Sequence, residues 1–198
     1  MNIRTALLAP LALIAAPVWG DPIPLADLSK YLNSITTAET DFTQVNADGT
    51  VGVGKIYLRR PGRMRFEYAP PDANLVLSSG GTVAIFDAKS NQPPEQYPLA
   101  RTPLSLILDA EIDLGTERMV VDYTESGNAT QVVAQDPNHP EYGNIALLFT
   151  NDPITLRQWV ITDDLGQQTT VILGSLTLDK DYKPALFSIE DEVARRQK

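Results

Sequence analysis

The sequence predicts a mainly β fold with some α-helix, in which an antiparallel sheet meanders and closes on itself. Short apolar runs recur at regular spacing, and turn residues such as Asn151-Asp152-Pro153 separate most of them. This regular spacing of apolar runs and turns is typical of an antiparallel meander. Of the 198 residues, 43% are hydrophobic, a composition that predicts one globular domain with a sizeable core.

The first twenty residues have the three parts of a secretory signal peptide. Arg4 gives a basic start, an apolar run extends from Ala6 to Ala16, and small residues stand at Val18 and Gly20. The apolar run is too short to cross a bilayer of about 30 Å. We therefore expect residues 1–20 to be a signal peptide and residues 21–198 to form a single domain outside the cytoplasm.

Charge and cysteine content exclude several classes of function. The net charge is −9, so phosphate backbones and anionic lipid headgroups repel the chain, and no nucleic-acid partner is expected. The chain has no cysteine, which excludes a disulfide framework and thiol chemistry.

One amphipathic helix is expected over residues 24–35, because Leu25, Leu28, Leu32 and Ile35 fall on one helical face. Strands follow, and the clearest is 63–68, where apolar and charged side chains alternate. Gly80-Gly81 predicts a hairpin between two of them. Strands are predicted over residues 51–59, 63–68, 74–79, 82–87, 118–123, 130–135, 144–150, 155–162, 169–178 and 185–190.

Residues 103–109 interrupt this β pattern. Pro103 suits a first helical position, and four aliphatic residues follow within the next five positions. A short helix that is apolar almost all round must bury most of its surface. It is either a core plug for the sheet or a lid over a cavity, and the residues alone favour the plug.

The residues of a catalytic or metal site are sparse. The single histidine, His139, lies in a loop beside Asp136 and Glu141, which is more typical of an exposed loop than of a tetrahedral metal site. No Gly-x-Ser-x-Gly segment presents a nucleophile, and Gly49, Gly52 and Gly54 match no phosphate-binding pattern. We expect no enzymatic activity, no metal and no cofactor.

Residues 57–70 hold four arginines within seven positions of an otherwise acidic chain. Arg59, Arg63 and Arg65 are most simply solvated charges on a strand. Arg60 directly precedes the Pro61-Gly62 turn, where its guanidinium could donate to the unpaired carbonyls at a helix C-terminus. Such bonds would hold a lid closed.

With these segments in view, the chain resembles the LolA family of periplasmic outer-membrane lipoprotein carriers, over roughly residues 25–190. The order and spacing of the matching pieces carry the resemblance: Asp41-Phe42-Thr43-Gln44, the run Gly54-x-Ile56-Tyr57-Leu58-x-Arg60-Pro61-Gly62-Arg63-Met64-Arg65-Phe66-Glu67-Tyr68, Pro70-Pro71, Leu75–Gly81, Phe86-Asp87 and Pro103–Leu108.

The resemblance implies an incomplete, unclosed antiparallel β-barrel with a helical lid over an apolar cavity. It implies acylated lipoproteins as cargo, released by an inner-membrane ATP-driven (ABC) transporter and delivered to the outer membrane, with an outer-membrane acceptor in those members that have one. The family's lid-latching arginine matches Arg60. A monomer is expected.

Strand alternation and the apolar helix together predict the lining of the acyl-chain cavity. The predicted residues are Met64, Phe66, Tyr68, Leu75, Leu77, Ile85, Leu104, Leu106, Ile107 and Leu108.

The chain departs from the family pattern at Ala84, where an aromatic residue is common, and at residues 190–198, where the usual proline-rich C-terminus is absent. The alternative function is a periplasmic module that senses lipids or lipoproteins on the same half-barrel scaffold.

Overall fold

A computed structural model describes residues 21–90, 92–115 and 118–197. The predicted signal peptide lies outside these described residues. Within them, no helix is long and apolar enough to cross a membrane.

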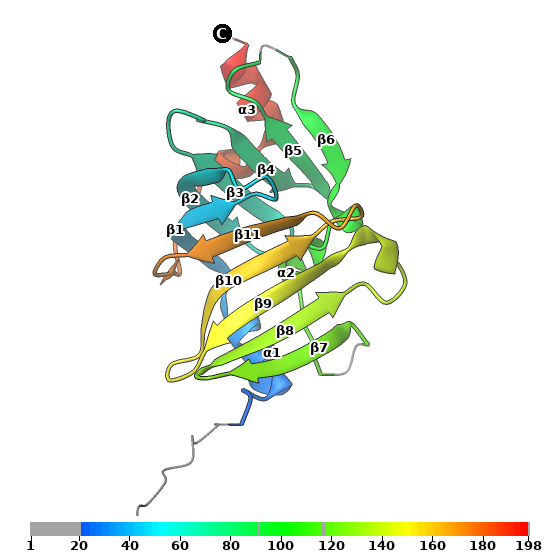
Figure 1. Cartoon of the computed structure of the whole chain (residues 1–198). Coiled ribbons are helices and arrows are strands. Elements are labelled where there is room, and N and C mark those ends of the chain that lie inside the picture. The colour runs from blue at the N-terminus through cyan, green and yellow to red at the C-terminus, as the bar shows by residue number, and fades with distance from the viewer. Residues whose placement is uncertain (1–20, 91, 116–117, 198) are drawn as a thin grey trace, which may run out of the picture.

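One twelve-stranded antiparallel sheet organises the described chain (Figure 1). Its order is β6-β5-β4-β3-β2-β1-β11-β10-β9-β8-β7, and β12 pairs with β1. Because β6 and β7 do not pair with each other, the barrel stays open. The closure expected from the strand spacing is therefore wrong, and the unclosed antiparallel barrel that the resemblance implies is confirmed. The strands are β1 (Thr37–Val45), β2 (Val51–Arg59), β3 (Arg63–Tyr68), β4 (Leu75–Ser79), β5 (Thr82–Phe86), β6 (Glu95–Pro98), β7 (Val120–Ser126), β8 (Ala129–Gln135), β9 (Asn144–Thr150), β10 (Thr155–Thr162), β11 (Gln168–Leu173) and β12 (Thr177–Leu178).

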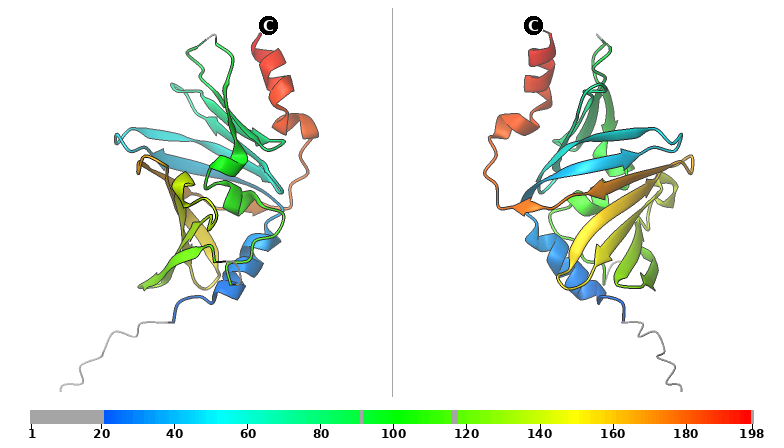
Figure 2. Two further views of the ribbon diagram at one scale, coloured as in Figure 1. Left: turned by 90° about the vertical axis from the view of Figure 1, so that its right-hand side faces the viewer. Right: turned by 60° about the vertical axis from the view of Figure 1, so that its left-hand side comes forward.

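The helices lie on both sides of the curled sheet (Figure 2). Two α-helices, α1 (Leu25–Ser34) and α2 (Ser105–Leu108), lie on the inner side, and α3 (Ile189–Arg196) lies outside β3, β4 and β5. The 3-10 helices are η1 (Leu99–Arg101), η2 (Pro140–Tyr142) and η3 (Pro184–Phe187).

Strand alternation assigns the inner face of the sheet. Ile145, Leu147 and Phe149 of β9 are fully buried inside, while their neighbours along the strand are half-buried. The inner residues of both halves of the sheet join α1 and α2 in one hydrophobic core. This core lies within the curl of the sheet, as the period-2 pattern requires.

Two glycines of β2 leave room for aromatic rings of the neighbouring strands. A Cβ atom at Gly54 would meet Glu67 O at 2.0 Å and the Phe42 ring at 2.9 Å, and one at Gly52 would lie 3.0 Å from the Tyr68 ring. Without side chains at these positions, the two aromatic rings lie directly over β2.

The helices predicted over 24–35 and 103–109 are confirmed as α1 and α2, the second one shorter than expected. Most predicted strands are confirmed too, four of them with the predicted bounds: 51–59, 63–68, 144–150 and 155–162. The strands β1 and β6 were not predicted. The strand expected over 169–178 divides into β11 and β12.

The strand predicted over 185–190 is wrong. Residues 184–187 form η3 instead, and α3 begins at Ile189. Ser188 caps α3, because its hydroxyl accepts a hydrogen bond from the amide of Asp191. Acidic residues fill the first turn of α3 and arginines its last turn, so the charges complement the helix dipole.

The C-terminal segment covers an apolar patch on the outer face of the sheet. Phe187 is fully buried there against β4 and β5. The residues it packs with form a second hydrophobic cluster, made of Leu75, Leu77, Ala84 and Phe86.

A buried ion pair fixes α3 beside this cluster. Arg65 and Glu192 are each only 5% exposed, and the Arg65 guanidinium donates to Glu192 Oε2 at 3.1 and 3.2 Å. Burial opposes ionisation of Glu192, but hydrogen bonds and charges from Arg196, Arg65 and Arg195 outweigh it, so the pKa of this carboxyl is lowered.

We expect Glu192→Gln to lower the free energy of unfolding by about 3 kcal/mol at pH 7, because it leaves buried arginine charge uncompensated. The folded-state pKa of Glu192 is below its ordinary value, so the contribution is present above about pH 4.5 and is lost as pH falls through the folded pKa. Denaturant unfolding at pH 7 and pH 3, followed by circular dichroism, measures this difference.

The matched control is Glu190→Gln, which removes an exposed carboxylate from the same helical turn. An equal loss in both variants would mean that the helix dipole, and not the ion pair, accounts for the effect.

Candidate functional site

The short helix α2 fills the inner face of the sheet. Leu104, Ile107 and Leu108 are buried and Leu106 is partly buried, all within the inner core. These four predicted residues therefore lie together in the core, as predicted for a short apolar helix. While α2 is in place, it occupies the space that the curl of the sheet encloses.

A small apolar cavity remains beside α2. Its volume is about 40 Å³, which is room for a water molecule or two and not for a long hydrocarbon chain. The lining residues come from α1, α2, β1, β2, β3, β10, β11 and adjoining turns: Leu32, Ile35, Ala38, Glu39, Thr40, Ile56, Leu58, Arg60, Met64, Ile107, Leu156, Trp159, Leu173 and Leu176.

Arg60 lies at one side of this cavity and bonds two helices. Its Nε donates to Asp109 O at 3.0 Å and its Nη2 to Ala110 O at 3.3 Å, both just after α2. Its Nη1 donates to Leu32 O and its Nη2 to Asn33 Oδ1 at 2.9 Å, both on α1. One guanidinium thus joins the end of β2 to the C-terminal ends of both inner helices.

The backbone around Arg60 holds this position. The Arg60 amide donates to Thr36 O at 2.8 Å, and the Gly62 amide donates to Leu108 O at 2.8 Å. Burial lowers the pKa of Arg60, while Asp109 opposes that shift, and an arginine stays charged at any physiological pH.

Two polar residues of α1 fasten the segment that follows α2. The Asn33 side chain donates to Ile112 O at 2.8 Å and accepts from the Ile112 amide at 3.0 Å. Ser29 Oγ accepts from the Leu114 amide at 2.9 Å. Sequence reasoning missed both residues, because a polar side chain on an amphipathic helix looks solvated until its partner is known.

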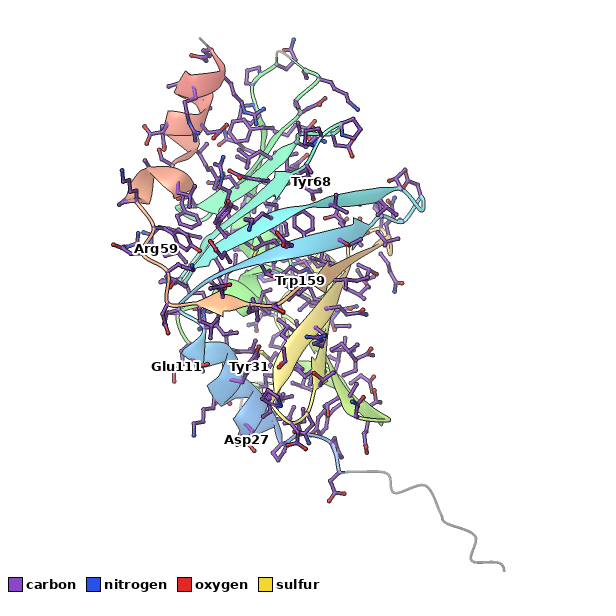
Figure 3. The ribbon with its side chains drawn as sticks, turned by 90° about the vertical axis from the view of Figure 1, so that its left-hand side faces the viewer. Asp27, Tyr31, Arg59, Tyr68, Glu111 and Trp159 are labelled. Carbon is purple, nitrogen blue, oxygen red and sulfur yellow. The ribbon has the colours of Figure 1, made fainter. Side chains whose placement is uncertain are left out.

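The predicted lining residues of β3 lie on the inner face. Met64 and Phe66 are buried in the inner core, and Tyr68 packs against it. Edge-to-face contacts between aromatic rings continue this row. The ring centroid of Phe42 lies 5.1 Å from that of Tyr68 and 5.5 Å from that of Phe66, and the centroids of Phe66 and Trp159 are 6.4 Å apart. Figure 3 shows Tyr68 and Trp159 along this part of the sheet.

Tyr68 has a polar end in this apolar row. Its hydroxyl donates to Gln44 Oε1 at 2.7 Å. Burial raises the pKa of Tyr68 to about 12. The phenol is therefore neutral at physiological pH.

Placing Leu75 and Leu77 in the cavity was wrong. Arg65 lies opposite Leu77 across the β3–β4 ladder, and residues directly opposite share a face of the sheet. Both leucines belong to the outer cluster beneath Phe187. The inner-facing residues of β4 are Val76, which packs against the inner core, and Ser78, which lies opposite Met64.

Ile85 is on the inner side but at its margin. It lies opposite Val76 across the β4–β5 ladder and is 38% exposed. With Val76 and Tyr68 it lines a separate surface pocket, apart from the cavity beside α2.

Further lining residues were missed, among them Ile56, Leu156, Trp159 and Leu173. All four lie on predicted strands, 51–59, 155–162 and 169–178. A bulge between Leu156 and Gln158 shifts the alternation within β10, which the sequence does not reveal.

The loop histidine lies apart from this cavity. His139 is exposed, stacks on Tyr142 at 4.7 Å, and its Nδ1 lies 3.0 Å from Glu141 Oε1. Across the described residues, no group of three or more His, Asp or Glu side chains is placed to hold a metal ion.

The geometry defines a class of protein: an open antiparallel half-barrel whose apolar inner face is filled by its own short helix. Residues 33–190 match the family model of the outer membrane lipoprotein carrier protein LolA, and the chain belongs to this family.

Two lipoprotein carriers and one solved structure are among the proteins similar to this chain. An outer-membrane lipoprotein carrier protein of Methylococcus capsulatus is 29% identical, over 88% of this chain and 90% of its own length. One of Pseudomonas aeruginosa is 25% identical, over 95% and 94%. A solved LolA superfamily protein of Nitrosomonas europaea aligns over 84% of this chain and 98% of that chain, at 9% identity and a TM-score of 0.44.

We expect Asn33→Ala to free the segment after α2, because the variant loses both bonds to Ile112 and one to Arg60. The free energy of local opening should fall by about 1–3 kcal/mol. Amide hydrogen exchange at residues 109–114 should accelerate, with no change in β9.

Ser34→Ala is the matched control, since the exposed Ser34 hydroxyl bonds only its own helix at Tyr31 O among the described contacts. Acceleration of the same size in both variants would contradict the role given to Asn33.

Proposed function

We propose that the chain is a non-enzymatic periplasmic carrier that holds the acyl chains of lipoproteins against its inner face and delivers them to the outer membrane. The single observation that carries the proposal is the placement of α2, an apolar helix that fills the inner face and is tethered at its end by Arg60. Membership of the lipoprotein carrier family supports the same conclusion.

The first step of the argument is exchange of α2 for cargo. The remaining cavity of about 40 Å³ is too small for an acyl chain, so loading requires α2 to leave. The residues that α2 covers, such as Met64, are apolar. Each methylene buried there gains about 0.8 kcal/mol, and the cargo hydrocarbon replaces the hydrocarbon contacts of α2.

The second step is unloading. Hydrogen bonds from Arg60 to Asp109 and Ala110 form only when the end of α2 is in place. They stabilise the empty state by about 1–3 kcal/mol, the range for charged hydrogen bonds. Cargo competes with this closed state, which lowers the apparent affinity and favours release.

The partners follow from the same proposal. Acylated lipoproteins are the cargo, an inner-membrane ABC transporter supplies them, and an outer-membrane acceptor or the membrane itself receives them. The carrier acts as a monomer, and its net charge of −9 disfavours adhesion to anionic lipid.

Adjacent residues of β11 test which face holds the chains. Leu173 lines the inner cavity, whereas Ile172 is 44% exposed on the outer face. A diacylated peptide should displace a hydrophobic fluorescent probe from the protein. Leu173→Ala should weaken that peptide's binding by roughly 15- to 60-fold, the worth of two to three lost methylene contacts at about 0.8 kcal/mol each.

Ile172→Ala, checked like its partner for native circular dichroism, should bind as the wild type does. Equal weakening by both variants, or no displacement from the wild type, would contradict the proposed inner-face site.

Arg60→Leu tests the tether. It should bind the diacylated peptide as tightly as the wild type or roughly tenfold more tightly, and release it more slowly to outer-membrane vesicles, because the competing closed state is weakened. Arg60→Lys should restore release only in part, since a point charge cannot bond several carbonyls as a planar fork does. Stopped-flow transfer of a labelled peptide measures the rates.

Arg63→Leu removes an exposed arginine three residues away and should leave release unchanged. Release from Arg60→Leu at the wild-type rate would remove Arg60 from the mechanism.

A further inference from the structure

Trp159 carries a polar atom that the proposed function does not yet use. Among the described residues, its Nε1 is the one buried side-chain nitrogen or oxygen without a hydrogen-bond partner. Trp159 is 3% exposed and lines the cavity beside α2. A buried donor without a partner is costly, so native structures usually provide one.

The neighbourhood of the indole offers few acceptors. The cavity is lined mainly by aliphatic residues, and its buried Thr40 hydroxyl, which donates to Asp41 O, accepts no hydrogen bond from the indole. Phe66 packs edge-on against the indole. In the closed state the N–H therefore lies in apolar surroundings, where a hydrogen bond to it would be strong.

Departure of α2 changes this environment. Ile107 of α2 lines the same cavity as Trp159, so whatever replaces α2 comes next to the indole. An ester-linked acyl chain is hydrocarbon except for its carbonyl oxygen, which is an acceptor. An apolar wall alone cannot fix how far such a chain slides along it, because hydrophobic contact is non-directional.

We infer that Trp159 Nε1 donates a hydrogen bond to an acyl ester carbonyl of the cargo. The indole N–H has this partner only in the loaded state, and the bond sets how deep the acyl chains lie in the cavity. The inference rests on the proposed carrier function. The indole bond stabilises the loaded state, because the empty state lacks it. The bonds from Arg60 to Asp109 and Ala110 stabilise the closed state, so the two sets of bonds favour opposite states.

The test replaces the N–H without changing the ring size. Trp159 is replaced site-specifically by β-(3-benzothienyl)alanine, in which sulfur stands for N–H, and the affinity is measured for two probes. One is a dipalmitoyl-glyceryl peptide with ester links, and the other is the same peptide with ether links, which lacks the carbonyls. The wild type should prefer the ester probe, and the replacement should cost that probe roughly five- to tenfold in affinity with little change for the ether probe.

The empty protein gives a second readout. Removing an unpaired buried donor should leave its unfolding midpoint unchanged or raised. Phe66→Leu is the matched control, because it removes aromatic contact from the same face without touching a donor, and it should weaken both probes equally.

The outcomes separate the two proposals. If the wild type and the replaced protein show the same ester-to-ether ratio, the indole is only a wall of the cavity and the inference is overturned, while the carrier function stands. If neither probe binds the wild type, the carrier function fails and this inference fails with it.

Discussion

An open sheet with an apolar inner face must cover that face, and the rest of this structure depends on that constraint. The barrel has no β6–β7 pairing to close it, so α1 and α2 supply the missing wall. The two helices that cover the face are held to it by different contacts. The longer helix α1 is joined to the sheet by buried side chains, whereas α2 has four helical residues and relies on its apolar contacts and a few polar bonds near its end.

Polar groups are few inside this core, and their placement distinguishes its states. Arg60 is satisfied when the inner helices are in place, and the indole of Trp159 is not. Hydrophobic contact alone gives no preference between the helix and a foreign hydrocarbon of similar area. In the proposed exchange of α2 for cargo, directional bonds would supply that preference, and single polar side chains in a cavity lined mainly by hydrocarbon would then decide between the two states.

Most of the fold could be predicted from the sequence, because strands buried on one face alternate clearly, as 63–68 does. The failures have physical reasons. The edge strand β6, Glu-Gln-Tyr-Pro, is exposed throughout and has no apolar pattern. The strand β4 is covered on both faces, so its sequence from Leu75 to Leu77 is one apolar run without alternation. The sequence therefore does not show which of these side chains face inward. Arg60 could be found from its place before a turn, but its partners on α1 could not, since they depend on tertiary contacts.

Leaving a sheet unclosed exposes two rows of unpaired backbone groups, which are templates for edge-to-edge aggregation. Here β6 has only four residues and ends on Pro98, which has no amide hydrogen to offer a neighbouring strand. A bulge between Val120 and Asp122 disturbs β7 at the opposite edge. Both devices make strand addition by a second molecule unfavourable. The two open edges of the half-barrel therefore pair poorly with the edges of a second copy, although no strand pairing closes the sheet.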